Sequence, residues 1–173
     1  MSFNVYITRQ IPEEGINILK KFCRTVEVNP YDRPLTYDEL LRLVKGRDAI
    51  LAMLSDKIDA RVMSEAADPC LKHTGTSLKI IANYAVGYDN IDVKAATSKD
   101  IVVTNTPGVL TDSTADMAWA LLFSIARRIV EGDRLTRAGK FVGWAPMFLL
   151  GGDLAGKTLG IIGAGRIGTA MAM

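Results

Sequence analysis

The chain has 173 residues, of which 49% are hydrophobic and 23% charged, and its formal net charge is +2. This balance is typical of a globular protein with one ordinary domain or two small ones, and it excludes a disordered chain. The basic residues are scattered and form no block or aromatic-interleaved stripe, so nucleic acid is not an expected partner.

Three features favour a soluble, cytoplasmic protein without a membrane partner. Two cysteines, Cys23 and Cys70, fit a reducing compartment and suggest no disulfide framework. The first residues lack a basic segment followed by an apolar run, so we expect no secretory signal. The longest uncharged apolar run, residues 117–126, is too short to cross a bilayer.

Short β-prone runs alternate with helical segments over the first hundred residues. Pro12 with two following glutamates is typical of a helix start, and Thr36 with Glu39 forms a capping box. The apolar run 49–53 predicts a strand that is buried on both faces. Strands are predicted at 5–8, 25–28, 49–53, 78–82 and 101–104, with helices between them, one at 58–67 after Asp56. This alternation predicts a doubly wound, parallel α/β sheet.

The stretch Asn105-Thr106-Pro107-Gly108 breaks this pattern and predicts a boundary between a domain at 1–105 and a second one at 106–173. The longest helical signal in the chain follows, and we expect one continuous helix over 111–138. Its first half is so apolar that another domain or a partner subunit must cover it.

Residues 157–168 predict a buried strand that runs into a glycine turn and a helix. Gly163, Gly165 and Gly168 match G-x-G-x-x-G, in which they permit the tight turn, the approach of a pyrophosphate and close helix packing, respectively. The motif alone is weak, because about 0.1 chance matches are expected at this composition. The βα units that complete a dinucleotide-binding domain would lie beyond Met173, so the motif is either a coincidence or the start of a truncated domain.

The loop at 83–92 follows the predicted strand 78–82, at the edge where such sheets bind ligands. Gly87 carries no side chain, so successive backbone amides could face a small anion such as a carboxylate. A plain turn with Asn90 or Asp92 as a helix cap is the alternative, and the residues alone favour it. His73, the single histidine, has no carboxylate partner at an informative spacing, and we expect it to be exposed in a polar loop. No metal-ligand set is visible.

Three stretches, residues 85–92, 104–116 and 154–168, together resemble the D-isomer-specific 2-hydroxyacid dehydrogenases, and the nearest branch is that of the glyoxylate/hydroxypyruvate reductases. The resemblance implies a flavodoxin-like, doubly wound substrate domain at 1–105. It also implies that 106–173 is the start of a Rossmann nucleotide-binding domain, with an interdomain and dimer helix at 111–138 and a glycine loop at 163–168.

The same resemblance implies roles for individual residues. Val86 and Gly87 would present backbone amides to the substrate carboxylate, and Val86 would also lie near the nicotinamide. Trp144 would reach toward the active site of a neighbouring subunit. Around the cofactor, a hydroxyl would come from Thr114 and the pyrophosphate contacts from Gly163, Gly165, Arg166, Ile167 and Gly168.

The resemblance implies NAD(P)-dependent reduction of a small 2-keto acid, glyoxylate or hydroxypyruvate, by a homodimeric parent protein. The family's catalytic arginine, glutamate and histidine would all lie beyond Met173, so we expect this chain alone to be inactive and to bind nucleotide very weakly. The choice between NAD and NADP stays open. D-3-phosphoglycerate dehydrogenase is an alternative activity, and a non-catalytic nucleotide-sensing or dimerisation module is an alternative of another class.

Overall fold

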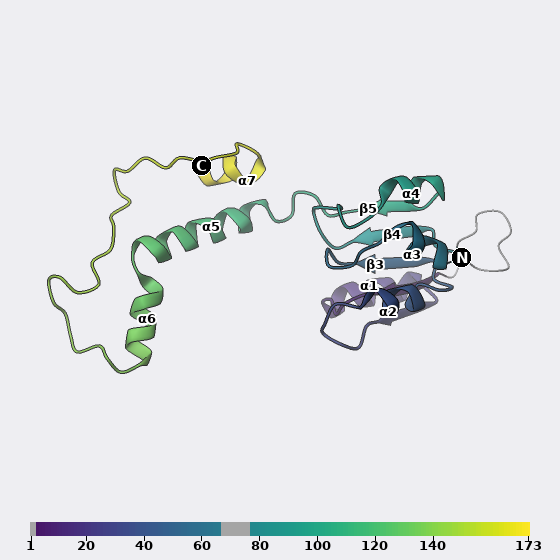
Figure 1. The fold of residues 1–173 in the computed structure, drawn as a ribbon, viewed down its shortest axis with the longest axis horizontal. Coiled ribbons are helices and arrows are strands. Elements are labelled where there is room, and N and C mark those ends of the chain that lie inside the picture. Colours follow the sequence, from purple (N-terminus) through teal and green to yellow (C-terminus); the bar gives the residue numbers. More distant parts are fainter. Residues whose placement is uncertain (1–2, 67–76) are drawn as a thin grey trace. The chain divides into compact units, whose positions relative to one another are not determined.

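The structure, a computed structural model, describes residues 3–66 and 77–173. The chain divides into two units, Met1–Pro107 and Gly108–Met173 (Figure 1), and each is described by itself. Cys70, His73 and most of the polar loop expected around them lie outside the described residues.

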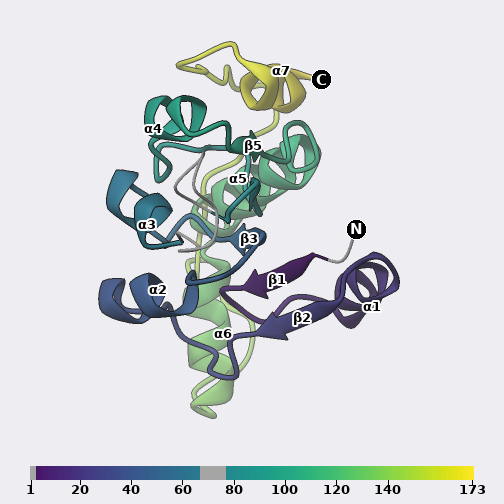
Figure 2. The ribbon, with the colours of Figure 1, turned by 90° about the vertical axis from the view of Figure 1, so that its right-hand side faces the viewer.

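A five-stranded, all-parallel sheet in the order β2-β1-β3-β4-β5 forms the centre of the first unit. Its strands are β1 (Asn4–Ile7), β2 (Thr25–Val28), β3 (Ala49–Ala52), β4 (Ile80–Asn83) and β5 (Val102–Thr104). Its helices are α1 (Glu13–Phe22), α2 (Tyr37–Leu43), α3 (Ala60–Glu65) and α4 (Val93–Ser98). In Figure 2, α1 lies on one side of the sheet and the other three helices on the opposite side. The predicted doubly wound α/β fold is confirmed, and this strand order is the flavodoxin-like one.

The helix starts follow local capping chemistry. Thr36 accepts a hydrogen bond from the amide of Glu39 at 3.3 Å, and the Glu39 carboxylate accepts one from the amide of Thr36 at 2.8 Å, which confirms the capping box. Helix α3 begins after Asp59, whose carboxylate accepts bonds from the amides of Arg61 and Val62. The expected start after Asp56 is therefore wrong, and the Asp56 side chain is buried instead.

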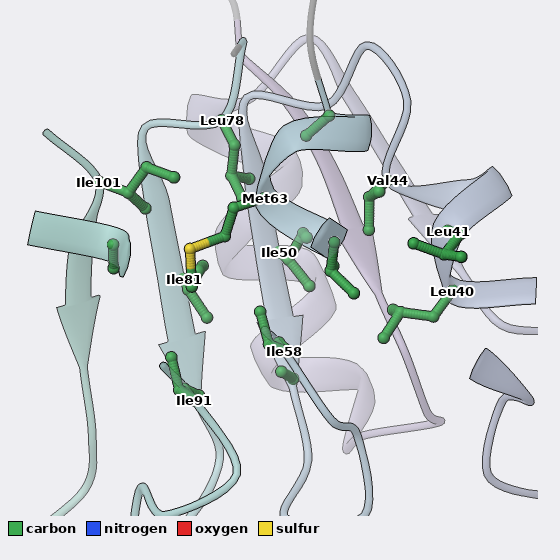
Figure 3. Packing of buried hydrophobic residues seen from close by; sticks show 14 residues of the cluster. Leu40, Leu41, Val44, Ile50, Ile58, Met63, Leu78, Ile81, Ile91 and Ile101 are labelled. Atoms are coloured by element: carbon green, nitrogen blue, oxygen red, sulfur yellow. The ribbon is translucent and has the colours of Figure 1, made fainter. Parts of the chain in front are cut away.

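The main core lies between the sheet and helices α2, α3 and α4 (Figure 3). Ile50 and Ile81 point from the sheet toward Leu40, Val44 and Met63, and all five are almost fully buried. Burying one aliphatic side chain of this size contributes about 1.5–3 kcal/mol, so this layer fixes the sheet and with it the loops at its edge.

The opposite face of the sheet is only partly covered, and the prediction of a strand buried on both faces is wrong for β3. Ile50 and Ala52 are buried in the core, whereas Ala49 and Leu51 are partly exposed. Ala49 and Leu51 line an almost entirely apolar hollow of about 400 Å³, to which Leu19 of α1 also contributes. The physical reason is that α1 is the one described helix of this unit on that face.

The second unit contains α5 (Thr111–Ala126), α6 (Ile129–Arg137) and α7 (Arg166–Ala172). The single helix predicted over 111–138 is wrong, because α5 ends at Ala126 and Arg128 adopts a left-handed conformation with φ 54°. The carbonyl of Ala126 accepts a hydrogen bond at 2.8 Å from the amide of Gly152, and Arg127 pairs with Asp153 at 2.8 Å. These contacts cap α5 from a distant segment, which helical periodicity does not reveal.

The strand predicted at 157–162 is also wrong. Within the described residues, Gly108–Met173 contains no strand, and Ile162 is fully exposed. A parallel strand needs a neighbour to receive its hydrogen bonds, and this unit offers none. No described helix is long and apolar enough to cross a membrane.

Candidate substrate and nucleotide site

Buried polar side chains gather at the carboxyl edge of the sheet. Thr8 follows β1 and donates a hydrogen bond to the carboxylate of Asp56, which follows β3 and also accepts from the amide of Met53 at 2.8 Å. Asn83 ends β4 and is 2% exposed. Ligands of open α/β sheets bind at this edge, so these groups support the loops that a ligand would meet.

The loop between β4 and α4 contains Val86 and Gly87, and three of its successive carbonyls are held by hydrogen bonds. The carbonyl of Ala85 accepts from the amide of Thr106 at 2.9 Å, that of Val86 from Nδ2 of Asn105 at 2.7 Å, and that of Gly87 from Nδ2 of Asn83 at 2.8 Å. The loop therefore has a defined backbone conformation, although it is neither helix nor strand.

The amides of the same loop are free. The backbone N–H groups of Val86 and Gly87 donate to no residue in the described part of the chain. In a planar trans peptide the N–H points opposite to the preceding C=O, so holding two carbonyls turns the next two amides away from the groups that hold them. Val86 and Gly87 are exposed, which leaves two adjacent donors open to an anion.

Gly87 is not required by the fold. A Cβ placed on it would meet only Cδ2 of Leu54, at an ordinary 3.9 Å, and its φ lies outside the left-handed region. The missing side chain therefore relieves no clash within the protein, and its effect is to keep the amides accessible.

The helix after this loop is capped by Asp92, whose carboxylate accepts from the amide of Ala95 at 2.9 Å. Asn90, the other residue that the sequence allowed as the cap, therefore does not cap this helix. Its Nδ2 donates instead to the carbonyls of Met53 and Asp56 at 3.1 and 3.0 Å. Sequence reasoning missed the hydrogen bonds of Asn83, Asn90 and Asn105, because an asparagine within a few residues of a glycine or proline is equally typical of a plain turn.

In the second unit, the glycine turn precedes α7. Gly163 has φ 100°, and a Cβ on Gly168 would lie 2.0 Å from the carbonyl oxygen of Gly163, so the backbone requires glycine at both positions. A Cβ on Gly165 would meet nothing within 4 Å, and its φ is ordinary. The open space beside Gly165 suits the close approach of a pyrophosphate, which is the group that this motif binds.

The remaining candidate residues of the second unit are exposed or partly exposed. Arg166 and Ile167 open α7, which packs against α5. Thr114 lies in the first turns of α5, where its hydroxyl donates to the carbonyl of Leu110 at 2.6 Å and keeps its lone pairs free. Trp144, in an irregular segment, is 83% exposed. Val86 and Gly87 belong to the first unit, whereas all the other candidate residues belong to the second.

The described residues contain no group of three or more His, Cys, Asp or Glu side chains that could hold a metal ion. The site that the structure does describe consists of backbone donors, an arrangement suited to carboxylates and phosphates.

A doubly wound sheet with a donor loop at its carboxyl edge, followed by a glycine turn, defines an α/β protein with features of nucleotide-dependent enzymes. Residues 5–159 match the catalytic domain of the D-isomer specific 2-hydroxyacid dehydrogenases, and the chain belongs to this family.

Similar proteins agree with this assignment. The chain is 50% identical to a glyoxylate reductase of Thermococcus kodakarensis over 97% of its own length and 49% of the relative's. A D-isomer specific 2-hydroxyacid dehydrogenase structure from Polaromonas has a TM-score of 0.89 at 35% identity, covering 99% of this chain and 51% of that one. A glyoxylate/hydroxypyruvate reductase of Sinorhizobium meliloti, in complex with NADP and malonate, has a TM-score of 0.66 at 28% identity, covering 99% and 49%. The chain spans about half the length of the curated relatives it matches.

Proposed function

We propose that the full-length protein containing this chain reduces glyoxylate, or a similarly small 2-keto acid, to the 2-hydroxy acid with NADH or NADPH. The observation that carries the proposal is the pair of free backbone amides at Val86 and Gly87, at the edge of the sheet where ligands bind. The similarity to glyoxylate reductases supports the choice of substrate.

In this proposal the two amides bind the substrate carboxylate by charge-assisted hydrogen bonds and so orient the neighbouring keto carbon. The substrate domain would comprise residues 1–105, and residues 106–173 would begin the nucleotide domain. Gly163, Gly165 and Gly168, with the amides of Arg166 and Ile167, would hold the pyrophosphate, and Thr114 would lie near the cofactor. The nicotinamide, when bound, supplies the hydride.

The homodimer expected through residues 111–138 is part of the same proposal, with Trp144 reaching toward the partner's site. Leu121 and Ile125 of α5 are 57% and 79% exposed, although this helix is predominantly apolar, so a covering surface would stabilise it. The cytoplasmic location and the choice between NAD and NADP stay predictions.

Absorbance of the reduced cofactor tests the activity. The full-length protein should oxidise NADH or NADPH with glyoxylate or hydroxypyruvate. Faster turnover of 3-phosphohydroxypyruvate would favour the phosphoglycerate dehydrogenase alternative, because the carboxylate loop suits all these acids equally. Binding of a reduced cofactor without turnover of any small 2-keto acid would refute the proposal in favour of a nucleotide-sensing module.

A further inference from the structure

We propose that Asn83, Asn90 and Asn105 are positioning residues that hold the carbonyls of the Val86–Gly87 loop so that its amides stay free for the substrate carboxylate. The inference rests on the proposed function and assigns a role to side chains that need not touch the substrate themselves.

The first step concerns the hydrogen bonds that fix the carbonyls of the loop. Asn105 donates to the carbonyl of Val86 and Asn83 to that of Gly87. Each bond fixes one peptide plane, and the N–H on the far side of that plane then points the other way. Asn105 thereby orients the amide of Gly87, and Asn83 orients that of Tyr88, an exposed third donor of the loop that also bonds to no described residue. The Val86 amide is oriented by the Ala85 carbonyl, which the amide of Thr106 holds. Without the two asparagines the peptides could rotate and turn the amides of Gly87 and Tyr88 from their outward direction.

The second step is the support behind Asn83. Its Nδ2 also donates to Oδ1 of Asn90 at 3.1 Å, and its Oδ1 accepts from Nδ2 of Asn90 at 3.3 Å, so the two amides form a reciprocal pair. Asn90 in turn donates to the carbonyls of Met53 and Asp56. The carbonyl of Gly87 is thus tied, through two side-chain amides, to the loop that follows β3.

The third step is the chemical identity of the side chain. The Asn83 amide both donates to a carbonyl and accepts from a second amide, whereas an ionised carboxylate can only accept. An aspartate there would have the same shape but no N–H, would face the carbonyl oxygen of Gly87, and would add negative charge beneath a loop that binds an anion. The substitution Asn83→Asp should therefore weaken substrate binding, although it hardly changes the size of the side chain.

The experiment measures kcat, KM for glyoxylate and the dissociation constant for NADH in the full-length protein and in Asn83→Asp and Asn105→Ala. KM should rise roughly tenfold or more with a smaller change in kcat, because the loop binds the carboxylate in ground state and transition state alike. The NADH constant should not change. Asn105 is only partly buried, whereas Asn83 is 2% exposed, so Asn105→Ala tests the loop even if Asn83→Asp folds poorly.

Asn29→Asp is the matched control. Asn29 is 1% exposed at the same edge of the sheet and donates to the carbonyls of Thr8 and Arg33, away from the loop. It should lower the unfolding temperature and leave KM unchanged. An unchanged KM in both loop variants, or an equal rise of KM in Asn29→Asp, would overturn the positioning role alone. A wild-type protein that turns over no 2-keto acid would overturn both this inference and the proposed function.

Discussion

At the scale of the residue, the glycines of the candidate site are of two kinds. Gly163 and Gly168 are dictated by backbone geometry, one by its positive φ and the other by a carbonyl that a Cβ would overlap. Gly87 and Gly165 have ordinary φ and room for a methyl group. Their small size serves the fold in no visible way, so it is best explained by a ligand that comes close to the backbone.

Gly87→Ala in the full-length protein should raise KM for glyoxylate roughly tenfold or more, because the methyl group lies beside the amides that bind the carboxylate. Its unfolding temperature should be unchanged or slightly higher. Gly152→Ala is a suitable control, since a Cβ at Gly152 also meets nothing unfavourable and lies outside the candidate site. Equal KM values in both variants would contradict the role of Gly87.

The glycine turn allows a second comparison in the full-length protein. Gly165→Ala should keep the unfolding temperature and reduce NADH affinity about tenfold, because the methyl group would fill the space for the pyrophosphate. Gly163→Ala should instead lower stability by about 1 kcal/mol or more, because alanine at φ 100° is strained. Thermal unfolding together with NADH fluorescence titration separates these effects, and a Gly165→Ala protein with native affinity would contradict the assignment.

The sequence pattern pointed to these glycines but not to the asparagines. A glycine motif can be recognised in a sequence because the same turn needs glycine at the same positions in every protein that contains it. Asn83 bonds within its own loop, whereas Asn90 reaches Met53, in the loop after β3, across 37 positions of the chain. Such pairs appear only once the parallel register is known.

At the scale of the element, α2 shows how local chemistry sets a helix start. The Glu39 carboxylate accepts from the amide of Thr36 and forms a two-point pair with Arg33 at 2.8 and 2.6 Å. The Arg33 hydrogen bonds, aided by those from Thr36, hold the pKa of Glu39 well below its usual range. The folded state therefore binds fewer protons here than the unfolded state.

Glu39→Gln should consequently destabilise the protein at pH 7 and have less effect in acid. A glutamine preserves the capping box, so the difference reports the charge and its pairing with Arg33. The stability from a lowered carboxyl pKa is complete above the ordinary value of 4.5 and is lost as pH falls below it. Denaturant unfolding of both proteins from pH 7 to pH 3 measures this, and a difference that grows in acid would contradict it.

Element prediction succeeded where signals were local and failed where they were not. All five strands of the first unit were predicted within two residues at either end, because apolar runs bounded by turn residues mark them. The break between α5 and α6 depends on Gly152, which lies 26 positions beyond Ala126, and no periodicity encodes it. The strand expected at 157–162 needs neighbouring strands to pair with, and a local sequence pattern does not show whether such strands are present.

At the scale of the whole molecule, apolar surface is left uncovered in both units. The hollow beside β3 and β4 exposes the aliphatic face of the sheet, and α5 exposes Met117, Leu121 and Ile125. Surfaces of this kind usually contact another chain segment or subunit. The curated relatives are about twice as long as this chain.

A polypeptide of these 173 residues should therefore bind NADH very weakly and show no turnover. The full-length protein should bind NADH and reduce the 2-keto acid. The glycine turn at 163–168 is exposed and has no strand behind it, so its amides are not held in the arrangement that a pyrophosphate needs. Calorimetric titration of both proteins with NADH tests this. A dissociation constant in the micromolar range for the 173-residue polypeptide would contradict it, and would mean that the turn alone suffices for binding.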